Sequence, residues 1–258
     1  MPQIHPMAVV ETGAQLADDV TVGPFAYIGS KVVLGPGCVV HHRASIHGNT
    51  VAGKDNHFFP GCVIGGIPQD LKYRGGDCRV IIGDNNRFRE LVTVNMGTED
   101  GGGVTEIGNG NLLMANVHVA HDCHIADHTV FANCASLAGH VEVGNHAVLG
   151  GFTGIHQFCR VGDHCMTGAA TVAVQDIPPY VLAAGNGAQP YGINVTGLRR
   201  RGFSTEAIHM LKRAYKILYK SGLRLEEAIT KIDELVPEHP ELAVLARFLK
   251  VEGRGIIR

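Results

Sequence analysis

Three histidines and one aspartate lie within nine residues of the chain, in the stretch Asn116–His124. A neutral imidazole, with a pKa near 6.5, can remove a proton from a hydroxyl group at neutral pH. His121 is followed directly by Asp122, whose carboxylate can orient an imidazole and stabilise its protonated form. We therefore interpret His121 as a general base and Asp122 as its partner. No serine or cysteine is evidently paired with them as a nucleophile, which favours direct transfer to a substrate hydroxyl.

A six-residue period surrounds this stretch and extends through most of the chain. A hydrophobic residue recurs at every sixth position from Ile4 to Ile64, then from Ile82 to Val94, and again from Ile107 to Val161. A helix would repeat at 3.6 residues and a simple strand at 2. A period of six instead predicts a parallel β-helix, a mainly-β fold in which 18 residues form one coil of three short strands.

Two segments interrupt the period, and we expect both to be loops. Gly65–Asp77 has the length to fill most of a coil but lacks the pattern, and Met96–Gly103 lies where the spacing exceeds two repeats by one residue. Loops that interrupt a rigid scaffold often carry function. The repeat fades after Ala173, where Pro178-Pro179 is expected to close the coil, and Gly185–Asn194 is expected to be a linker.

The charge distribution predicts a β-helical domain at residues 1–191 and a small α-helical domain at residues 192–258. The second part carries 13 Lys and Arg against 8 Asp and Glu, whereas the first carries 9 against 16. We expect one helix from a cap at Ser204 to Gly222, a second near Leu225–Leu235, and a third from Pro240 to about Val251. The basic residues of this domain form either a solvated face or a docking site for an acidic partner.

Composition and charge exclude several classes of protein. The net charge of −2 suggests neither a nucleic-acid-binding protein nor one that binds anionic membranes. No run approaches 18 apolar residues and the N-terminus has no signal-peptide pattern, so we expect no stable membrane insertion and a cytoplasmic location. Seven cysteines without a CxxC motif indicate reduced thiols. Five of them occupy the small-residue position of the repeat, where a buried thiol acts as a small hydrophobe: Cys38, Cys62, Cys123, Cys159 and Cys165.

The 18-residue coil brings together residues that are distant in the sequence. One edge of the coil is expected to carry a column formed by His121, His140, His156 and Gln157. The turn Ala138-Gly139-His140 offers a backbone N–H on the neighbouring coil, which could stabilise an oxyanion. A column of this kind is typical of an enzyme, because a non-catalytic scaffold has no need of it.

A zinc site is the main alternative chemistry. Trimeric left-handed β-helix proteins include zinc enzymes that resemble γ-class carbonic anhydrase, with three histidine ligands across a subunit boundary. Here His118, His121 and His124 are three residues apart, and the alternation of a strand sends such side chains in different directions. We therefore expect neither a metal ion nor another cofactor.

The sequence resembles the UDP-N-acetylglucosamine 3-O-acyltransferase family, whose members begin lipid A biosynthesis. The resemblance covers essentially the whole chain, and its motifs are specific when they are taken together. It rests on the hexads and on Asp70-Leu71-Lys72-Tyr73, Ala120-His121-Asp122-Cys123, Leu137-Ala138-Gly139-His140-Val141, His156-Gln157-Phe158-Cys159, Pro178-Pro179-Tyr180 and Gly197-Leu198-Arg199-Arg200-Arg201-Gly202-Phe203.

The resemblance implies a left-handed parallel β-helix with a C-terminal helical domain, assembled as a homotrimer with active sites between neighbouring subunits. A 3-hydroxyacyl group would pass from acyl carrier protein, docked on the basic helical domain, to the 3-hydroxyl of UDP-N-acetylglucosamine. His121 matches the general base, Asp122 its polarising partner and Gly139 the oxyanion-binding amide. Substrate-binding residues are implied at Asp70, Lys72, His118, His140, His156, Gln157, Asn194, Arg200 and Arg201.

The chain departs from the family in two places. The family usually reads His-Arg-Gly-Thr where this chain has Asn95-Met96-Gly97-Thr98, which affects either donor binding or loop packing. The acyl-length determinant of the family falls near Met166–Ala169, with Gly168 present and Ala169 where enzymes that take long chains often have glycine. A methyl group there is expected to shorten the accepted chain slightly. An N-acyltransferase of the related glucosamine family, or acylation of a 3-amino sugar, is an open alternative.

Overall fold

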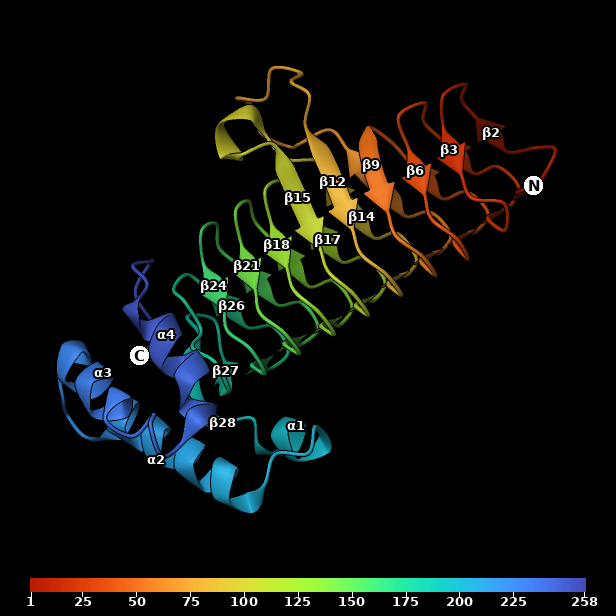
Figure 1. Ribbon diagram of the computed structural model, residues 1–258. Coiled ribbons are helices and arrows are strands. Elements are labelled where there is room, and N and C mark those ends of the chain that lie inside the picture. The colour runs from red at the N-terminus through yellow and green to blue at the C-terminus, as the bar shows by residue number, and fades with distance from the viewer.

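Short parallel strands wind into a prism with three flat faces, here called sheets A, B and C (Figure 1). The computed structural model describes residues 1–258. In Figure 1 the strands of the near face run downward while the chain advances from the N-terminus at the right toward the left, so the coil is left-handed. The predicted left-handed parallel β-helix is confirmed.

Most strands are only two residues long. Sheet A contains β1 (Gln3–Ile4), β4 (Thr21–Val22), β7 (Val39–Val40), β10 (His57–Phe58), β13 (Arg87–Phe88), β16 (Leu112–Leu113), β19 (Val130–Phe131), β22 (Val148–Leu149), β25 (Met166–Thr167), β27 (Val181–Ala184) and β28 (Gln189–Ile193). Sheet B contains β2 (Val9–Val10), β5 (Tyr27–Ile28), β8 (Ser45–Ile46), β11 (Val63–Gly66), β14 (Thr93–Asn95), β17 (His118–Val119), β20 (Ser136–Leu137), β23 (Gly154–Ile155) and β26 (Val172–Ala173). Sheet C contains β3 (Gln15–Leu16), β6 (Val33–Leu34), β9 (Asn49–Ala52), β12 (Arg79–Ile82), β15 (Val104–Ile107), β18 (His124–Ile125), β21 (Glu142–Val143) and β24 (Arg160–Val161).

The hexad residues form the core of the prism. Val119 pairs with Leu137 and Leu137 with Ile155, so positions 18 apart stack on successive coils, and all three are buried. The five cysteines predicted at small-residue positions are buried and free, as expected. Where this position precedes sheet A, it also holds Asn56 and Asn86. The Asn56 side-chain oxygen accepts a hydrogen bond from the Asn86 backbone N–H at 3.0 Å, so these polar groups tie one coil to the next.

Each coil turns three corners, which we name BC, CA and AB after the sheets that they join. Non-glycine residues adopt a left-handed φ near 60° at these corners, a conformation that L-residues seldom use. Corner BC has Asp122, His140 and Phe158 at this position; corner CA has His128, His146 and His164; corner AB has Leu91, Asn116, Cys134, Phe152 and Ala170. These residues are 18 apart, except that Leu91 and Asn116 are separated by the second loop, so their side chains stack along the prism edges.

The two predicted loops leave the prism at neighbouring points. The first connects β11 to β12, and the second connects β14 to β15 and contains the short 3₁₀ helix η1 (Glu99–Gly101). The carboxylate of Glu99 accepts hydrogen bonds from the backbone N–H groups of Arg74 (3.1 Å) and Gly76 (2.7 Å). Arg74 also forms an ion pair with Asp100 at 3.1 Å. The two loops therefore form one unit.

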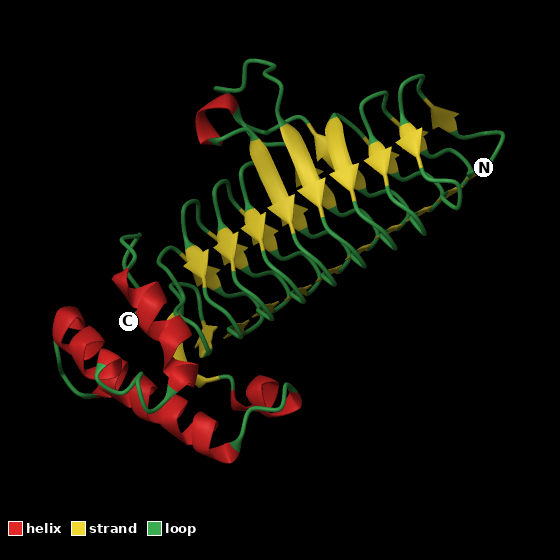
Figure 2. Cartoon of the chain, viewed as in Figure 1, coloured by secondary structure: helices red, strands yellow, loops and turns green.

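The helices form a small domain at the C-terminal end of the prism (Figures 1 and 2). They are α1 (Val195–Arg200), α2 (Thr205–Lys220), α3 (Leu225–Asp233), η2 (Pro240–Leu242) and α4 (Ala243–Lys250). Three helices lie where the sequence predicted them, and the side chain of Ser204 caps α2 by accepting from the Ala207 N–H. Their apolar faces bury a separate core around residues such as Leu211 and Leu245. No helix has the length and apolar character to cross a membrane.

The start of this domain differs from the expectation. Gly185–Asn194 is not a plain linker, because it contains β28, which pairs antiparallel with β27 and closes the coil. Residue 191 lies within this strand. The sequence analysis also missed α1, which is only six residues long and is capped by Asn194.

Candidate active site

His121 and Asp122 form a pair at corner BC. His121 Nδ1 lies 2.8 Å from Asp122 Oδ2, so the ring donates from Nδ1 and leaves the Nε2 lone pair free to accept a proton. Adjacent residues in a strand would diverge, but the left-handed φ of 58° at Asp122 turns its carboxylate back toward the imidazole. The predicted orientation of His121 by Asp122 is therefore present in the structure.

The second loop holds the Asp122 carboxylate in place. Asp122 is 2% exposed, and its two oxygens accept hydrogen bonds from Thr98 N (2.9 and 3.2 Å) and Thr98 Oγ1 (2.6 Å). A Cβ atom on Gly101 would lie within 3 Å of all three carboxyl atoms, so glycine is needed where η1 covers them. The sequence analysis missed the role of Thr98, because its partner is 24 residues away.

Gly139 lies directly beneath the His121 ring. A Cβ atom at position 139 would be 2.5 Å from His121 Cε1 and 2.7 Å from Nε2, so only glycine leaves room for the imidazole. The Gly139 N–H donates to no acceptor within the chain. An unpaired amide beside an imidazole is suited to an oxyanion, and the role of Gly139 stays a prediction.

The histidine column has a different membership from the one predicted. The rings of His121 and His140 meet edge to face at 5.1 Å, and the ring stacked on His140 at 4.4 Å is that of Phe158. His156 instead contacts the Gln157 carbonyl oxygen at 3.2 Å. Both residues lie at corner BC as expected, but the 18-residue register aligns His140 with Phe158. The spacing from Asp122 to His140 to Phe158 was the signal that could have identified this aromatic residue.

Asp70 and His118, two of the predicted substrate-binding residues, lie near His121. Asp70 Oδ2 from the first loop lies 3.9 Å from His121 Nε2, which is too long for a hydrogen bond and leaves Nε2 unpaired. The neighbouring Lys72 side chain is exposed. His118 on β17 contacts Thr93 Oγ1 at 2.7 Å, and burial lowers its pKa. Burial also lowers the pKa of His140, with the Asp122 carboxylate acting in the opposite direction.

The other predicted site residues lie away from corner BC. Asn194 is buried and uses both ends of its amide within the chain, accepting from Gly197 N and donating to the His164 carbonyl. Arg201 lies at corner CA, where its Nη1 is 2.7 Å from His146 Nδ1. Arg200 and Arg201 are exposed, as are Met166 on sheet A and Ala169 at corner AB, whereas Gly168 is half-buried. Within one chain the predicted site residues are therefore divided among corner BC, corner CA and the region of sheet A and corner AB.

Asn95 and Met96 serve loop packing. Asn95 Nδ2 donates to the Ile67 carbonyl oxygen at 3.1 Å and so fastens the first loop to the end of β14. Met96 is buried, and its sulfur would lie 2.3 Å from a Cβ atom on Gly48. The departure from the usual family residues thus concerns how the loop is anchored.

His121, Asp122 and His140 offer one potential metal-ligand atom each within 4.8 Å of one another. The Asp122 carboxylate, however, already accepts hydrogen bonds from Thr98 and His121. These donors fit a carboxylate that orients an imidazole. The prediction that no metal is bound stays a prediction.

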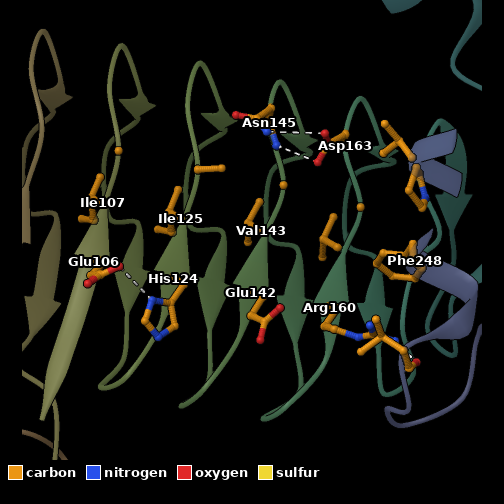
Figure 3. Close-up of a pocket in the computed structure, with 18 of the residues that line it drawn as sticks. Glu106, Ile107, His124, Ile125, Glu142, Val143, Asn145, Arg160, Asp163 and Phe248 are labelled. Atoms are coloured by element: carbon orange, nitrogen blue, oxygen red, sulfur yellow. Dashed lines mark hydrogen bonds and ion pairs between the residues drawn. The ribbon is translucent and has the colours of Figure 1, made fainter. Parts of the chain in front are cut away.

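A groove leads from corner BC across sheet C to the helical domain. A cavity of about 460 Å³ is lined by Asp122, His140, Phe158 and the C-terminal segment Val251–Arg254. It shares lining residues with a cavity of about 810 Å³ between sheet C and α4. Figure 3 shows this larger cavity, with Glu106, His124, Glu142 and Arg160 along the strands and Phe248 at the helical end. The two cavities therefore form a continuous path from the His121–Asp122 pair to the helical domain.

Comparison with known proteins identifies the family. The chain is 52% identical, over the full length of both proteins, to the acyl-[acyl-carrier-protein]--UDP-N-acetylglucosamine O-acyltransferase of Thiobacillus denitrificans. The chain belongs to the UDP-N-acetylglucosamine O-acyltransferase family. Residues 176–257 match the model of the second domain of UDP-N-acetylglucosamine O-acyltransferase, and residues 105–139 match the bacterial transferase hexapeptide model.

Solved structures of the UDP-N-acetylglucosamine O-acyltransferase family share the whole architecture. The LpxA structure from Acinetobacter baumannii is 42% identical, with a TM-score of 0.97 and 99% of each chain covered. The UDP-N-acetylglucosamine acyltransferase of Arabidopsis is 34% identical, with a TM-score of 0.87, and the match covers 99% of this chain and 100% of that one. The resemblance inferred from the motifs is therefore confirmed.

Proposed function

We propose that this protein transfers a 3-hydroxyacyl group from acyl carrier protein to the 3-hydroxyl of UDP-N-acetylglucosamine, the first step of lipid A biosynthesis. The observation that carries the proposal is the His121–Asp122 pair, with a free Nε2 and with its ring packed against Gly139. This geometry suits a base that acts on a hydroxyl group beside a developing oxyanion.

The proposed reaction proceeds in two steps. His121 Nε2 removes the proton of the sugar 3-hydroxyl as its oxygen attacks the thioester carbonyl, and the new negative charge on the carbonyl oxygen is stabilised by the Gly139 N–H. The tetrahedral intermediate then collapses, the C–S bond breaks, and the imidazolium returns its proton to the leaving thiolate. Asp122 stabilises the imidazolium between these steps. Asp70 and His118 contact the sugar from the open side of the ring.

We propose that the active enzyme is a homotrimer. Corner AB exposes Phe25 (54%), Leu91 (56%) and Phe152 (68%), and Met166 lies exposed on the adjoining sheet A. Apolar side chains aligned along one edge of a prism favour burial against other copies of the chain. Such packing brings corner BC of one protomer toward sheet A of the next. One site would then combine His121 with Arg200, Arg201 and Met166–Ala169 of its neighbour.

The acyl carrier protein is proposed to dock on α2. Lys212, Arg213, Lys216 and Lys220 are exposed on this helix and take part in no ion pair. An unpaired basic surface is complementary to an acidic carrier protein. The reaction would accordingly take place in the cytoplasm with its carrier. The charge reversal Lys212→Glu with Lys216→Glu is expected to raise the KM for the acyl carrier thioester while leaving the KM for the sugar nucleotide unchanged.

The decisive experiment incubates the purified protein with UDP-N-acetylglucosamine and a panel of acyl carrier protein thioesters of 10 to 16 carbons, with products identified by mass. His121→Ala is expected to reduce turnover by roughly 10²–10⁴-fold without loss of folding. Near-wild-type turnover would remove His121 from the role of base. An optimum at the longest acyl chain would contradict the proposed effect of Ala169.

The same assay tests the alternative acceptor. A 3-amino analogue of the sugar nucleotide is offered beside the 3-hydroxyl form, and preference for the amine would make the protein an N-acyltransferase. Metal analysis of the active protein checks the absence of a cofactor. Stoichiometric zinc, with loss of turnover on chelation, would support the zinc chemistry instead.

A further inference from the structure

Corner CA carries a second stack of histidines, apart from the His121 column. The rings of His128 and His146 are stacked at 5.1 Å with an interplanar angle of 10°, and those of His146 and His164 at 4.9 Å and 25°. Tyr180 continues the stack beyond His164 at 5.7 Å. All four residues have a left-handed φ between 58° and 70°, so the backbone fixes the direction of each ring.

His146, the middle histidine of this stack, contacts Arg201. Arg201 Nη1 lies 2.7 Å from His146 Nδ1. A guanidinium group can only donate, so His146 must accept at Nδ1 and is therefore neutral, with its proton on Nε2. Arg201 follows the last residue of α1, and the imidazole fixes the position of its guanidinium group at the corner.

A neutral partner leaves the charge of Arg201 intact. The guanidinium forms no ion pair within the chain, although two carboxylates, Asp127 and Asp163, lie near His146. The Oδ1 atoms of both accept backbone N–H groups instead, from Asn109 at 2.6 Å and Asn145 at 3.1 Å. A carboxylate partner would have cancelled the positive charge of Arg201, whereas an imidazole orients the guanidinium and leaves its charge free for an anion.

The surroundings of His146 favour its neutral form. Burial is the first cause that lowers its pKa, followed by the positive charges of Arg201 and His128, while Asp163 and Asp127 act in the opposite direction. His164, on the other side of the ring, has its pKa lowered to about 4 by burial. His146 therefore stays an acceptor at neutral pH, and its protonation in acid removes the lone pair that Arg201 uses.

We propose that His146 is a positioning residue for the sugar-nucleotide site, which holds the charged Arg201 guanidinium in place for the diphosphate of UDP-N-acetylglucosamine. This inference rests on the proposed function, in which Arg201 contacts the nucleotide. It adds a residue and a pH dependence to that site.

The test compares UDP-N-acetylglucosamine binding by calorimetry, and KM and kcat, among variants of the full-length protein. His146→Phe keeps a ring in the stack but removes the acceptor, and is expected to weaken binding about tenfold with little change in kcat. His146→Gln restores an acceptor and is expected to recover most of the affinity. His128→Phe, in the same stack but without contact to Arg201, serves as the matched control and is expected to keep the wild-type dissociation constant.

Two further measurements separate positioning from a structural role. In an Arg201→Ala background, His146→Phe is expected to cause no additional loss of affinity, because the two residues act as one unit. The affinity of the wild type is expected to fall between pH 7.5 and 5 more steeply than that of His146→Gln. Equal losses for His146→Phe and His128→Phe, additive losses with Arg201→Ala, or parallel pH profiles would each overturn the inference. Failure of the wild type to bind the sugar nucleotide would instead contradict the proposed function.

Discussion

At the scale of single residues, the active site depends on how closely the His121 ring approaches the backbone. The imidazole occupies the space that a side chain at Gly139 would fill. This contact fixes the proposed base and the proposed oxyanion-binding amide relative to each other. A displacement of about 1 Å of a catalytic group can cost 10²-fold in rate, so the glycine matters as much for position as for its N–H.

Gly139→Ala is therefore expected to lower kcat by about 10²-fold, because the new methyl group displaces the His121 ring. Steady-state kinetics with the acyl carrier thioester measures the effect. Gly29→Ala is a matched control at corner BC near the N-terminus, where the nearest atom to the new Cβ would be 3.6 Å away. Equal effects of the two substitutions would contradict the argument.

His164 is expected to make stability depend on pH. Its folded pKa is about 4, below the unfolded value of 6.5, because burial disfavours the charged ring. The unfolded chain therefore binds a proton that the folded chain excludes, and stability falls as pH drops from 6.5 to 4. For this partly buried ring the loss amounts to roughly 1–3 kcal/mol.

His164→Phe, which keeps an aromatic ring against Tyr180, is expected to flatten this dependence. Urea unfolding between pH 4 and 7 measures the free energy of unfolding of both proteins. Parallel curves for wild type and variant would show that His164 does not cause the acid loss.

At the scale of elements, the two loops that interrupt the β-helix act as one unit. Glu99 in η1 accepts from two backbone N–H groups of the first loop, which also carries Asp70, while Thr98 beside it holds Asp122. The loop that carries Asp70 and the loop that holds the Asp122 carboxylate are thereby joined.

Glu99→Ala is expected to weaken sugar-nucleotide binding, because Asp70 loses its support. Two backbone N–H groups of the first loop also lose their charged acceptor. Hydrogen exchange of the first loop and the KM for UDP-N-acetylglucosamine are the two measurements. Glu106→Ala on sheet C, where the carboxylate contacts His124 and no loop, is the control. Unchanged exchange in the first loop would refute the coupling of the loops.

The repeat predicted the prism well, because each hexad residue packs against the residue at the equivalent position one coil away. Residues such as Val119 and Leu137 depend only on this local rule. The rule also placed His121, Asp122 and Gly139 together. The repeat did not predict which side chain stacks on His140. That residue is Phe158, one position after the expected His156–Gln157 pair. Thr98 and the contact between His146 and Arg201 were not predictable, because loop and helix paths do not follow the period.

At the scale of the whole molecule, one prism cannot complete the proposed site. His121 lies at corner BC and Arg201 at corner CA, on opposite sides of sheet C. In the proposed trimer, a single substrate contacts both kinds of residue because they come from different protomers. The exposed apolar edge at corner AB is the proposed surface for that assembly.

Subunit mixing tests the shared site. Each variant, His121→Ala or Arg201→Ala, is expected to have low activity when it is expressed alone. Their co-expression is expected to restore roughly a quarter of the sites, the share for random mixing in a symmetric trimer. Activity of the purified mixed trimers is the readout. No recovery above the separate variants would place both residues in a site within one chain.

The exposed edge is tested independently. Phe152→Glu is expected to convert the trimer into monomers without activity, because a charge cannot be buried unpaired at the interface. Light scattering measures the mass. Val51→Glu on the outer face of sheet C is the control, since Val51 is also partly exposed but lies away from corner AB. A trimeric, active Phe152→Glu protein would contradict this interface.

The 18-residue coil has a consequence for how such an enzyme can change. An insertion that stays within the coiled path and is not a whole coil shifts every later side chain out of register, whereas a whole coil moves them all by one strand spacing, about 4.8 Å. The two loops keep the register because their extra residues leave the prism. The separation between the base at corner BC and the helical domain can thus change only in fixed steps. Smaller changes in the proposed site come from single side chains within a coil, such as Ala169. Whole coils therefore change the dimensions of the site in large steps, and single substitutions change them in small ones.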